Sequence, residues 1–358
     1  MKNILKLSFL TLIVFAFTIN VNAGNKDRVG QAGANELLIN PWARSAGLHS
    51  LNTSGVQGIE AMRLNVGGLA FVEKTQIAFS STRWLSGSGV NINALGFAQR
   101  LGEDGGVLGV SMMALTPGDI ELTTENLPDG GTGETFNPLF LNIGVAYSRS
   151  FSNSIHGGVV FRLINQSIAN LRASGFAIDA GIQYVTGARD NFKFGIALRN
   201  VGTPMRFNGD GLDFTYTNPV NGEDQKGSQR TEKFELPSLL NIGISYDLYF
   251  SESEDFRLTV AGSFTSNSFR NDYIGAGLEF GWKNMFMLRG GFKYEDGMFD
   301  YTEAVSAMSG FAGGLTVQVP LKKGALQDGG PSLGLDYSYR STRNTFSGNH
   351  AFSVVFNL

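Results

Sequence analysis

Hydrophobic and polar residues alternate strictly in many segments of this chain. In the last nine residues, 350–358, every second side chain is large and apolar, and those between are mostly small or polar. Successive side chains of a strand point to opposite faces, so this segment predicts a strand with one apolar and one mostly polar face. Such a strand at the end of a chain is typical of an outer-membrane β-barrel, with lipid outside and a wet lumen inside.

The same alternation predicts about fourteen strands from residue 76 onward, among them 176–184, 192–199, 240–248, 274–282 and 333–340. A soluble β-sandwich also alternates. Here, however, the polar face carries mostly Gly, Ala, Ser and single charges, as a crowded lumen requires. Aromatic residues also recur near strand ends, where interfacial girdles lie: Tyr147, Tyr184, Phe250, Trp282, Tyr294 and Tyr339. We therefore expect an all-β fold, a transmembrane antiparallel β-barrel of about 14 strands.

The connections between these strands alternate between long and short. Those after odd-numbered strands include 117–138, 201–236 and 296–309, whereas those after even-numbered strands, such as 151–154 and 283–284, are tight. In outer-membrane barrels the long loops lie outside the cell and the short turns in the periplasm. The pattern therefore predicts that both termini lie on the periplasmic side.

The first 23 residues predict a secretory signal peptide. Lys2 and Lys6 form a positive start, 7–17 is a mostly apolar run, and 21–23 is a small-residue cleavage site. The alternative is an N-terminal membrane anchor, for which the apolar run is short. We expect the mature chain to begin near Gly24 and to reach the bacterial outer membrane.

Residues 24–72 do not alternate, and we expect short helices over 31–40 and 53–64. A barrel of about fourteen strands has room for a plug. We therefore assign 24–72 to an N-terminal plug, at least partly inside the lumen near the periplasmic mouth, and 73–358 to the barrel. The alternative is a loose periplasmic tail.

Composition supports a membrane protein without spanning helices. Charged residues make up 16% of the chain, whereas soluble domains average about 25%. There is no Cys, so no disulfide, thiol chemistry or lipoprotein attachment is expected. Removing Lys2 and Lys6 leaves 26 basic and 31 acidic residues, a net charge of −5, which gives no reason to expect nucleic-acid binding.

Residues for catalysis or metal binding are sparse. The three histidines, His49, His156 and His350, fall in separate regions without partners for a Ser-His-Asp site or a metal cluster. The acidic connection 117–138 lacks the spacing of a calcium loop. We therefore expect no enzymatic activity, no catalytic residue, no cofactor and no metal site. Arg44 of the plug is expected to neutralise a lumenal carboxylate, Asp179 or Glu279.

Several motifs resemble those of the PorV/PorQ family of outer-membrane proteins. They are Glu-Leu-Leu-Ile-Asn-Pro-Trp-Ala-Arg-Ser-Ala-Gly at 36–47, Asn-Val-Gly-Gly-Leu-Ala at 65–70, and shorter matches at 118–120, 131–136, 200–202 and 205–207. Val66 and Gly67 stand where the family usually has Pro and Ala. The similarity runs over nearly the whole mature chain.

This resemblance implies a fourteen-stranded barrel akin to the fatty acid transporter FadL, in the outer membrane of Bacteroidetes-type bacteria. It also implies a role in type IX secretion, in which the barrel binds a translocon and receives the signal domains of exported proteins. The expected partners are thus outer-membrane lipid, a larger outer-membrane complex and exported signal domains. The connection 201–236, with Phe207, Phe214 and Tyr216, is the expected docking loop.

The alternative function is a FadL-like transporter of hydrophobic small molecules across the outer membrane. We rank it second because the predicted inward faces carry mostly Gly, Asp, Arg, Lys and Gln, a poor lining for an apolar solute. A purely structural barrel is a third possibility.

Overall fold

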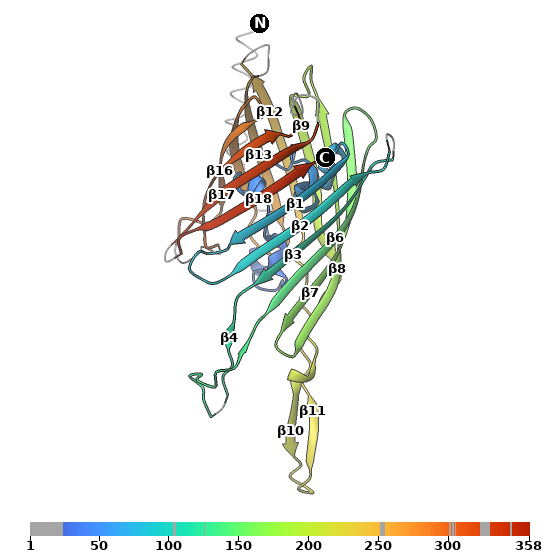
Figure 1. Cartoon of the computed structure of the whole chain (residues 1–358). Helices are drawn as coiled ribbons and strands as arrows, with labels where there is room; N and C mark the ends of the chain where they lie inside the picture. The colour runs from blue at the N-terminus through green and yellow to red at the C-terminus, as the bar shows by residue number, and fades with distance from the viewer. Residues whose placement is uncertain are drawn as a thin grey trace.

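Fourteen strands form a closed antiparallel barrel around an N-terminal plug (Figure 1). The computed structural model describes residues 24–102, 105–124, 126–250, 255–300, 302, 304, 306–322, 330–343 and 346–358. The expected fold class, a fourteen-stranded barrel with a short helical segment near the N-terminus, is confirmed. The predicted signal peptide, residues 1–23, lies outside the described residues and stays a prediction.

Each barrel strand pairs with its neighbours along the chain, and the last strand closes the barrel against the first, with Phe79 opposite Val354. In chain order the barrel strands are β1 (Thr75–Arg83), β2 (Asn91–Arg100), β3 (Val107–Thr116), β6 (Leu139–Ser150), β7 (Ile155–Ile168), β8 (Leu171–Thr186), β9 (Phe192–Gly202), β12 (Leu239–Tyr249), β13 (Phe256–Asn267), β14 (Tyr273–Trp282), β15 (Phe286–Glu295), β16 (Met308–Pro320), β17 (Ser332–Thr342) and β18 (Asn349–Asn357). Two small hairpins, β4 (Ile120–Glu121) with β5 (Thr135–Phe136) and β10 (Asp213–Thr217) with β11 (Asp224–Ser228), lie outside this wall, the second after the 3-10 helix η5 (Asp210–Leu212).

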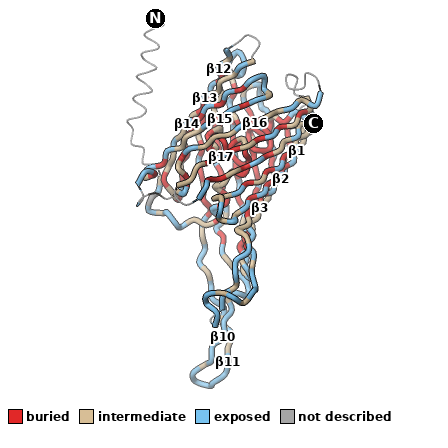
Figure 2. Tube along the Cα trace, turned by 60° about the vertical axis from the view of Figure 1, so that its left-hand side comes forward, coloured by how far each residue is buried: buried red, intermediate tan, exposed pale blue. Residues whose placement is uncertain are grey.

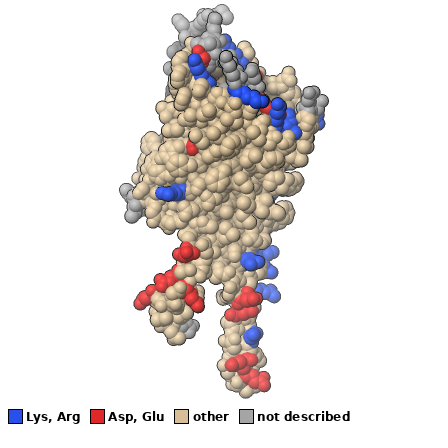
Figure 3. All heavy atoms as spheres, in the orientation of Figure 1, with Lys and Arg blue, Asp and Glu red and all other residues tan. Residues whose placement is uncertain are grey.

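Alternate residues of the wall face outward and inward, as the sequence predicts. On β18, Phe352 is 56% exposed, whereas its neighbours Ala351 and Ser353 are each 2% exposed. Figure 2 shows buried and less buried positions alternating along the strands of the wall. On the face seen in Figure 3, charged side chains gather toward the two ends and are few on the wall between them. This apolar belt suits the hydrocarbon core of a bilayer.

The two longest connections, between β3 and β6 and between β9 and β12, project from the same end of the barrel, which we call the long-loop end (Figure 1). The carboxyl terminus lies at the opposite end, the short-turn end, together with turns such as 151–154 and 187–191. The expected alternation of long and short connections therefore holds for the longest loops. One connection at the long-loop end, 169–170, is itself tight.

The plug consists of short helical turns: η1 (Lys26–Arg28), η2 (Asn35–Leu38), α2 (Ala43–Ala46), η3 (Gly58–Glu60), α3 (Ala61–Leu64) and η4 (Val66–Phe71). The two helices expected over 31–40 and 53–64 are thus shorter and more broken than predicted. The stretch 65–70 contains most of η4, and the N-cap residue Asn65 stabilises the start of this helix because its side chain accepts a hydrogen bond from Gly67 N–H. Among the described residues, no helix is both long enough and apolar enough to cross a membrane.

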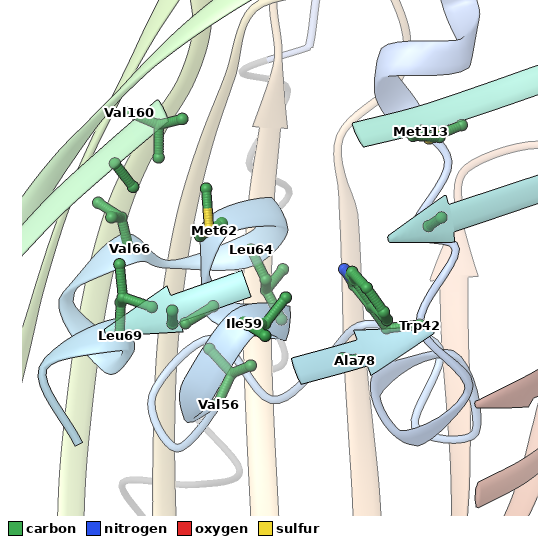
Figure 4. Close-up of a cluster of buried hydrophobic side chains, with 14 of the residues drawn as sticks. Trp42, Val56, Ile59, Met62, Leu64, Val66, Leu69, Ala78, Met113 and Val160 are labelled. Carbon is green, nitrogen blue, oxygen red and sulfur yellow. The ribbon is translucent and has the colours of Figure 1, made fainter. Parts of the chain in front are cut away.

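The plug packs an apolar cluster against one side of the inner wall. Val56, Ile59, Met62 and Leu69 of the plug gather with the wall residue Val160 and its neighbours (Figure 4). Inward-facing small residues permit this close packing: a Cβ added at Gly181 would lie 2.2 Å from the Asn65 Oδ1 atom. The small lumenal residues read from the sequence are therefore contact sites for the plug.

The plug runs along the lumen from one end to the other. Near its start, Arg28 forms an ion pair of 3.0 Å with Glu235 of the long connection after β9. At its end, Arg100 donates hydrogen bonds to the carbonyl oxygens of Ala70 and Val72 at the short-turn end. Two expectations are corrected here. The plug does not sit only near the periplasmic mouth. The two termini were expected on the same side, but Gly24, the first described residue, lies beside Asp272 at the long-loop end, opposite to the carboxyl terminus.

Candidate functional site

A cavity of about 630 Å³ lies between the plug and the wall at the long-loop end. We call it the upper cavity. This volume is within the range of about 300–1,000 Å³ that is usual for small-molecule sites. Its apolar lining comes from the plug, from strand ends and from connections: Leu38, Ile39, Trp84, Leu115, Phe140, Ile168, Phe207 and Met308.

Polar groups also line the upper cavity, and most of them have partners. The Lys293 ammonium lies 3.8 Å from a Glu295 carboxylate oxygen and 4.4 Å from the centre of the Tyr273 ring. Both carboxylate oxygens of Glu36 accept hydrogen bonds from the Gln166 amide, at 3.0 and 2.9 Å. Burial raises the pKa of Glu36 above its ordinary value, so this wall of the cavity loses negative charge more readily than a surface carboxylate.

A second cavity, of about 310 Å³, lies at the short-turn end and is mostly polar. We call it the lower cavity. Two smaller cavities of about 50 and 90 Å³ lie deeper in the barrel and share Arg44 and Gln57 with it. Cavities are therefore found from the short-turn end as far as Glu60 of the plug.

Residues 47–52 lie between the upper cavity and one of the small cavities below it, and we call them the barrier segment. His49 and Ser50 line the upper cavity, whereas Leu48 and Asn52 line one of the small cavities below. His49 and Ser50 have φ values of 54° and 61°, a left-handed backbone that costs non-glycine residues about 1–2 kcal/mol each. The barrier segment is therefore short and held in a strained conformation.

The barrier segment rests on a patch of wall without side chains. A Cβ added at Gly291 would lie 2.9 Å from the Leu48 carbonyl group, and one at Gly277 would lie 2.9 Å from the Leu48 side chain. A Cβ added at Gly47 would lie 3.0 Å from the Gly314 Cα atom on β16. The segment is held there by packing against glycines, and none of the ion pairs between described residues involves it.

Elsewhere charged side chains attach the plug to the wall. The Glu279 carboxylate accepts hydrogen bonds from Arg257 at 2.7 Å and Arg289 at 2.9 Å, and Arg44 of the plug approaches it to 4.0 Å. The expected neutralisation of Glu279 by Arg44 is confirmed. The alternative partner, Asp179, instead pairs with Arg162 of the wall at 2.7 Å.

The Asp179–Arg162 pair belongs to a second charged cluster that touches the plug. Arg162 donates a hydrogen bond to the Met62 carbonyl oxygen at 3.0 Å. Arg63 of the plug donates to the Ile39 and Glu36 carbonyl oxygens, at 2.9 and 2.5 Å. Burial and the nearby guanidiniums of Arg162 and Arg199 lower the pKa of Arg63. These contacts fix the part of the plug on either side of the barrier segment.

The three histidines lie apart. His156 on β7 packs against Phe71 and bonds to Ser150, and His350 on β18 bonds to Tyr337. His49 is buried in the barrier segment, where burial and the charges of Lys293 and Arg340 lower its pKa well below the ordinary value. Within the described part of the chain, no three His, Cys, Asp or Glu residues are placed to hold a metal ion.

The aromatic residues of the long connection after β9 separate in the structure. Phe207 lines the upper cavity, whereas Phe214 and Tyr216 lie exposed on the β10–β11 hairpin. Sequence reasoning treated all three as anchors for a protein and did not find the cavity. The useful signal was that apolar inward residues, such as Leu115 and Phe140, cluster at one end of neighbouring strands.

No family model matches the sequence, and no curated protein matches it. Solved structures do resemble the fold. A deltaS2S3 mutant of the monoaromatic hydrocarbon channel TodX has a TM-score of 0.55 at 13% identity, covering 88% of this chain and 98% of its own. The monoaromatic hydrocarbon channel CymD gives 0.53 at 12% identity, with coverages of 93% and 98%. A FadL homologue from Pseudomonas aeruginosa gives 0.50 at 9% identity, with coverages of 88% and 98%.

These likenesses show a FadL-like barrel fold and correct the main functional expectation. The expectation of a PorV-like subunit that binds exported proteins is wrong, because the neighbouring structures are named as hydrocarbon channels. The physical reason is the upper cavity. The inward strand residues are polar on average, but the apolar ones meet plug and loop residues at the long-loop end.

Proposed function

We propose that this chain is an outer-membrane channel for hydrophobic small molecules. The observation that carries the proposal is the upper cavity, whose apolar lining faces the long-loop end and whose floor is the barrier segment. Transfer of an apolar solute from water into such a cavity is favourable, by roughly 25 cal/mol per Å² of apolar surface removed from water.

The route then leads past the barrier segment toward the lower cavity. The rest of the plug is attached by ion pairs and hydrogen bonds, whereas residues 47–52 rest on glycines of the wall. Displacement of this segment opens the upper cavity toward the small cavity below it and leaves the rest of the plug in place. The strained backbone of His49 and Ser50 favours such a local change.

One comparison and one structural observation support the proposal. TodX and CymD, which share the fold, are named as monoaromatic hydrocarbon channels. The apolar outer belt also suits an outer membrane, and lipid is the partner that the proposal requires. Cleavage of residues 1–23, membership of the PorV/PorQ family and association with a larger complex stay predictions. The channel requires no catalytic residue.

The test uses the full barrel in vesicles with lipopolysaccharide in the outer leaflet. N-phenyl-1-naphthylamine, a neutral apolar dye, is added outside, and an enclosed cyclodextrin that brightens the dye reports its entry. Phe140→Ser places a hydroxyl in the upper cavity and is expected to slow entry several-fold. Phe214→Ser, which changes an exposed ring on the β10–β11 hairpin, is the matched control and is expected to leave entry unchanged.

Two results would count against the channel. One is dye entry no faster than into vesicles without protein. The other is an equal effect of the two Phe→Ser substitutions, since only one of these rings lines the upper cavity. Retention of an enclosed polar dye during the assay shows that the vesicles are intact.

A further inference from the structure

A second hollow at the long-loop end, of about 460 Å³, lies between β8 and the long connection after β9. We call it the outer hollow. Its lining consists of Arg172, Ser174, Pro204, Arg206, Asn208 and Lys233. The nearest acids along the connection, Asp210 and Glu232, are not part of this lining. Cationic side chains are also seen where the β10–β11 hairpin joins the barrel (Figure 3), so positive charge is concentrated here.

The outer hollow faces away from the lumen. On β8, Ala173 and Ala177 are buried against the plug, whereas Ser174 between them is exposed. Arg172 is two residues before Ser174, so both side chains lie on the outward face of the strand. The hollow is therefore separate from the upper cavity, which lies inside the wall.

Arg206 and Lys233 are held opposite each other by the backbone. Met205 and Phe234 exchange two backbone hydrogen bonds, at 2.9 and 2.8 Å, as an antiparallel pair, so the next residues on the two segments also oppose each other. Met205 is buried, and its neighbour Arg206 therefore points away from the lumen. No ion pair between described residues includes Arg172, Arg206 or Lys233. Like charges directly opposite each other are destabilising, so a bound anion would offset their repulsion.

Arg172 brings a third cation from the wall itself. It exchanges two backbone hydrogen bonds with Asn208, at 2.8 and 2.9 Å, which hold the long connection against β8. The Ser174 hydroxyl accepts a hydrogen bond from the Asn165 amide at 2.9 Å and keeps its own proton to donate. Two guanidiniums, an ammonium and a hydroxyl are the donors that suit the oxygens of a phosphate group.

The outer hollow lies at the edge of the apolar belt. Ser174 pairs with Asn165 of β7, and two residues further along the same strands Phe176 pairs with Leu163. Both of these apolar side chains are exposed, at 48% and 64%. Two strand residues span about 7 Å, so the change from polar to apolar surface is close to the hollow. A lipid with its phosphate in the hollow would lay its acyl chains on Phe176 and Leu163.

We propose that the outer hollow binds the phosphate group of a membrane lipid in the leaflet at the long-loop end, with Arg172, Arg206 and Lys233 as its cationic contacts. The neighbouring apolar surface favours a lipid over a soluble phosphate compound. A bound lipid bridges β8 and the long connection, and so holds this connection against the wall. The site lies outside the lumen, so the inference does not depend on the proposed channel function.

The test compares two lipids with the same chains, dioleoyl phosphatidate and dioleoylglycerol, which lacks the phosphate. Binding of each to the full barrel in detergent micelles is measured by native mass spectrometry. The wild-type protein is expected to bind phosphatidate at least about tenfold more tightly, because hydrogen bonds between charged groups are strong. Arg172→Gln, Arg206→Gln and Lys233→Gln are each expected to weaken phosphatidate binding by about fivefold and to leave dioleoylglycerol binding unchanged.

Lys226→Gln is the matched control for Lys233→Gln. It removes the same charge from an exposed residue of the same connection, on β11, which does not line the outer hollow. It is expected to leave phosphatidate binding unchanged. Folding of each variant is checked by its heat-dependent mobility on gels. Excess inorganic phosphate is expected to leave the bound phosphatidate in place, because it has no acyl chains to contact the belt.

The possible outcomes separate the lipid site from its alternatives. Equal binding of the two lipids by the wild type, or equal losses in Lys226→Gln and Lys233→Gln, would overturn the phosphate site. Complete displacement of phosphatidate by inorganic phosphate would assign the hollow to a soluble phosphate compound and overturn the lipid. None of these results changes the expected dye entry, so the channel proposal stands or falls on its own test.

Discussion

The Glu60 carboxylate accepts two hydrogen bonds from Ser45, from its backbone N–H at 3.0 Å and from its hydroxyl at 2.5 Å. These residues are fifteen positions apart and join the two halves of the plug on either side of the barrier segment. Burial and the nearby Asp336 together raise the pKa of Glu60 to about 7, although Arg44 and the Ser45 hydrogen bond lower it in part. The contact therefore couples plug packing to pH.

Plug packing is expected to weaken between pH 4.5 and pH 7. The folded-state pKa of Glu60 is above the ordinary value of 4.5, so the folded protein holds this proton when the unfolded chain has lost it. Its contribution is complete below pH 4.5 and is lost as the pH rises through about 7, an effect on the order of 3 kcal/mol at most. Amide hydrogen exchange of residues 43–60 at pH 5 and pH 8, corrected for intrinsic rates, measures it.

Glu60→Gln keeps an acceptor for Ser45 but does not titrate, so its exchange should depend much less on pH. Glu73→Gln, at an exposed position near the short-turn end, is the control and should behave like the wild type. Equal pH dependence in all three proteins would assign the effect to another group.

Removal of Asp179 is expected to destabilise the barrel strongly. This carboxylate pairs with Arg162 and also accepts a hydrogen bond from Asn200 N–H at 2.6 Å. Asp179→Ala leaves buried guanidinium groups without a counter-charge, which typically costs about 3–5 kcal/mol. Urea unfolding in detergent, followed by tryptophan fluorescence, measures the loss.

Asp119→Ala, in the exposed connection after β3, is the control and should change stability by less than about 0.5 kcal/mol. The double substitution Asp179→Leu with Arg162→Leu should recover part of the loss, because it removes both charges. A double variant less stable than Asp179→Ala would show that the ion pair is not the reason for the cost.

The wall could be predicted from the sequence because its determinants are local. Phe352 and Ser353 are adjacent, and lipid on one side and a filled lumen on the other dictate which faces which. The connection lengths correctly predicted that the longest loops lie at one end, because loop length is also a local property of the sequence. Neither inference needs knowledge of distant contacts.

The cavity and the plug could not be predicted in this way because they depend on contacts between distant segments. Trp84 and Arg340 stack although β1 and β17 are far apart in the chain, and they meet through closure of the barrel by β18. Gly291 reads from the sequence as one more small lumenal residue, yet its role is set by Leu48. The inward faces of the strands are polar on average over their whole length, and this average hides the apolar residues at the long-loop end.

Gly291→Ala is expected to loosen the barrier segment. The new methyl group would lie 2.9 Å from the Leu48 carbonyl group, so residues 47–52 must shift. Overpacking of this kind typically costs about 1–3 kcal/mol. If the barrier segment is the gate, dye entry into vesicles should become faster while the wall stays folded.

Gly290→Ala is the matched control, because its Cβ would lie 3.8 Å from the nearest atom, the Ala312 carbonyl oxygen, and would meet no plug residue. It should change neither dye entry nor plug exchange. Slower entry in Gly291→Ala than in Gly290→Ala would place the gate elsewhere in the plug.

A charge placed on the outer belt is expected to oppose insertion into lipid. Phe161 lies midway along β7 and is 59% exposed, whereas Phe299, 72% exposed, lies in the connection between β15 and β16. Phe161→Arg should make folding into vesicles less favourable by about 2–4 kcal/mol, and Phe299→Arg should have little effect, because the cost of a charge depends on depth in the bilayer. Urea titrations of folding into phosphatidylcholine vesicles compare the two variants. Equal costs would mean that the strand segment around Phe161 does not face the bilayer core.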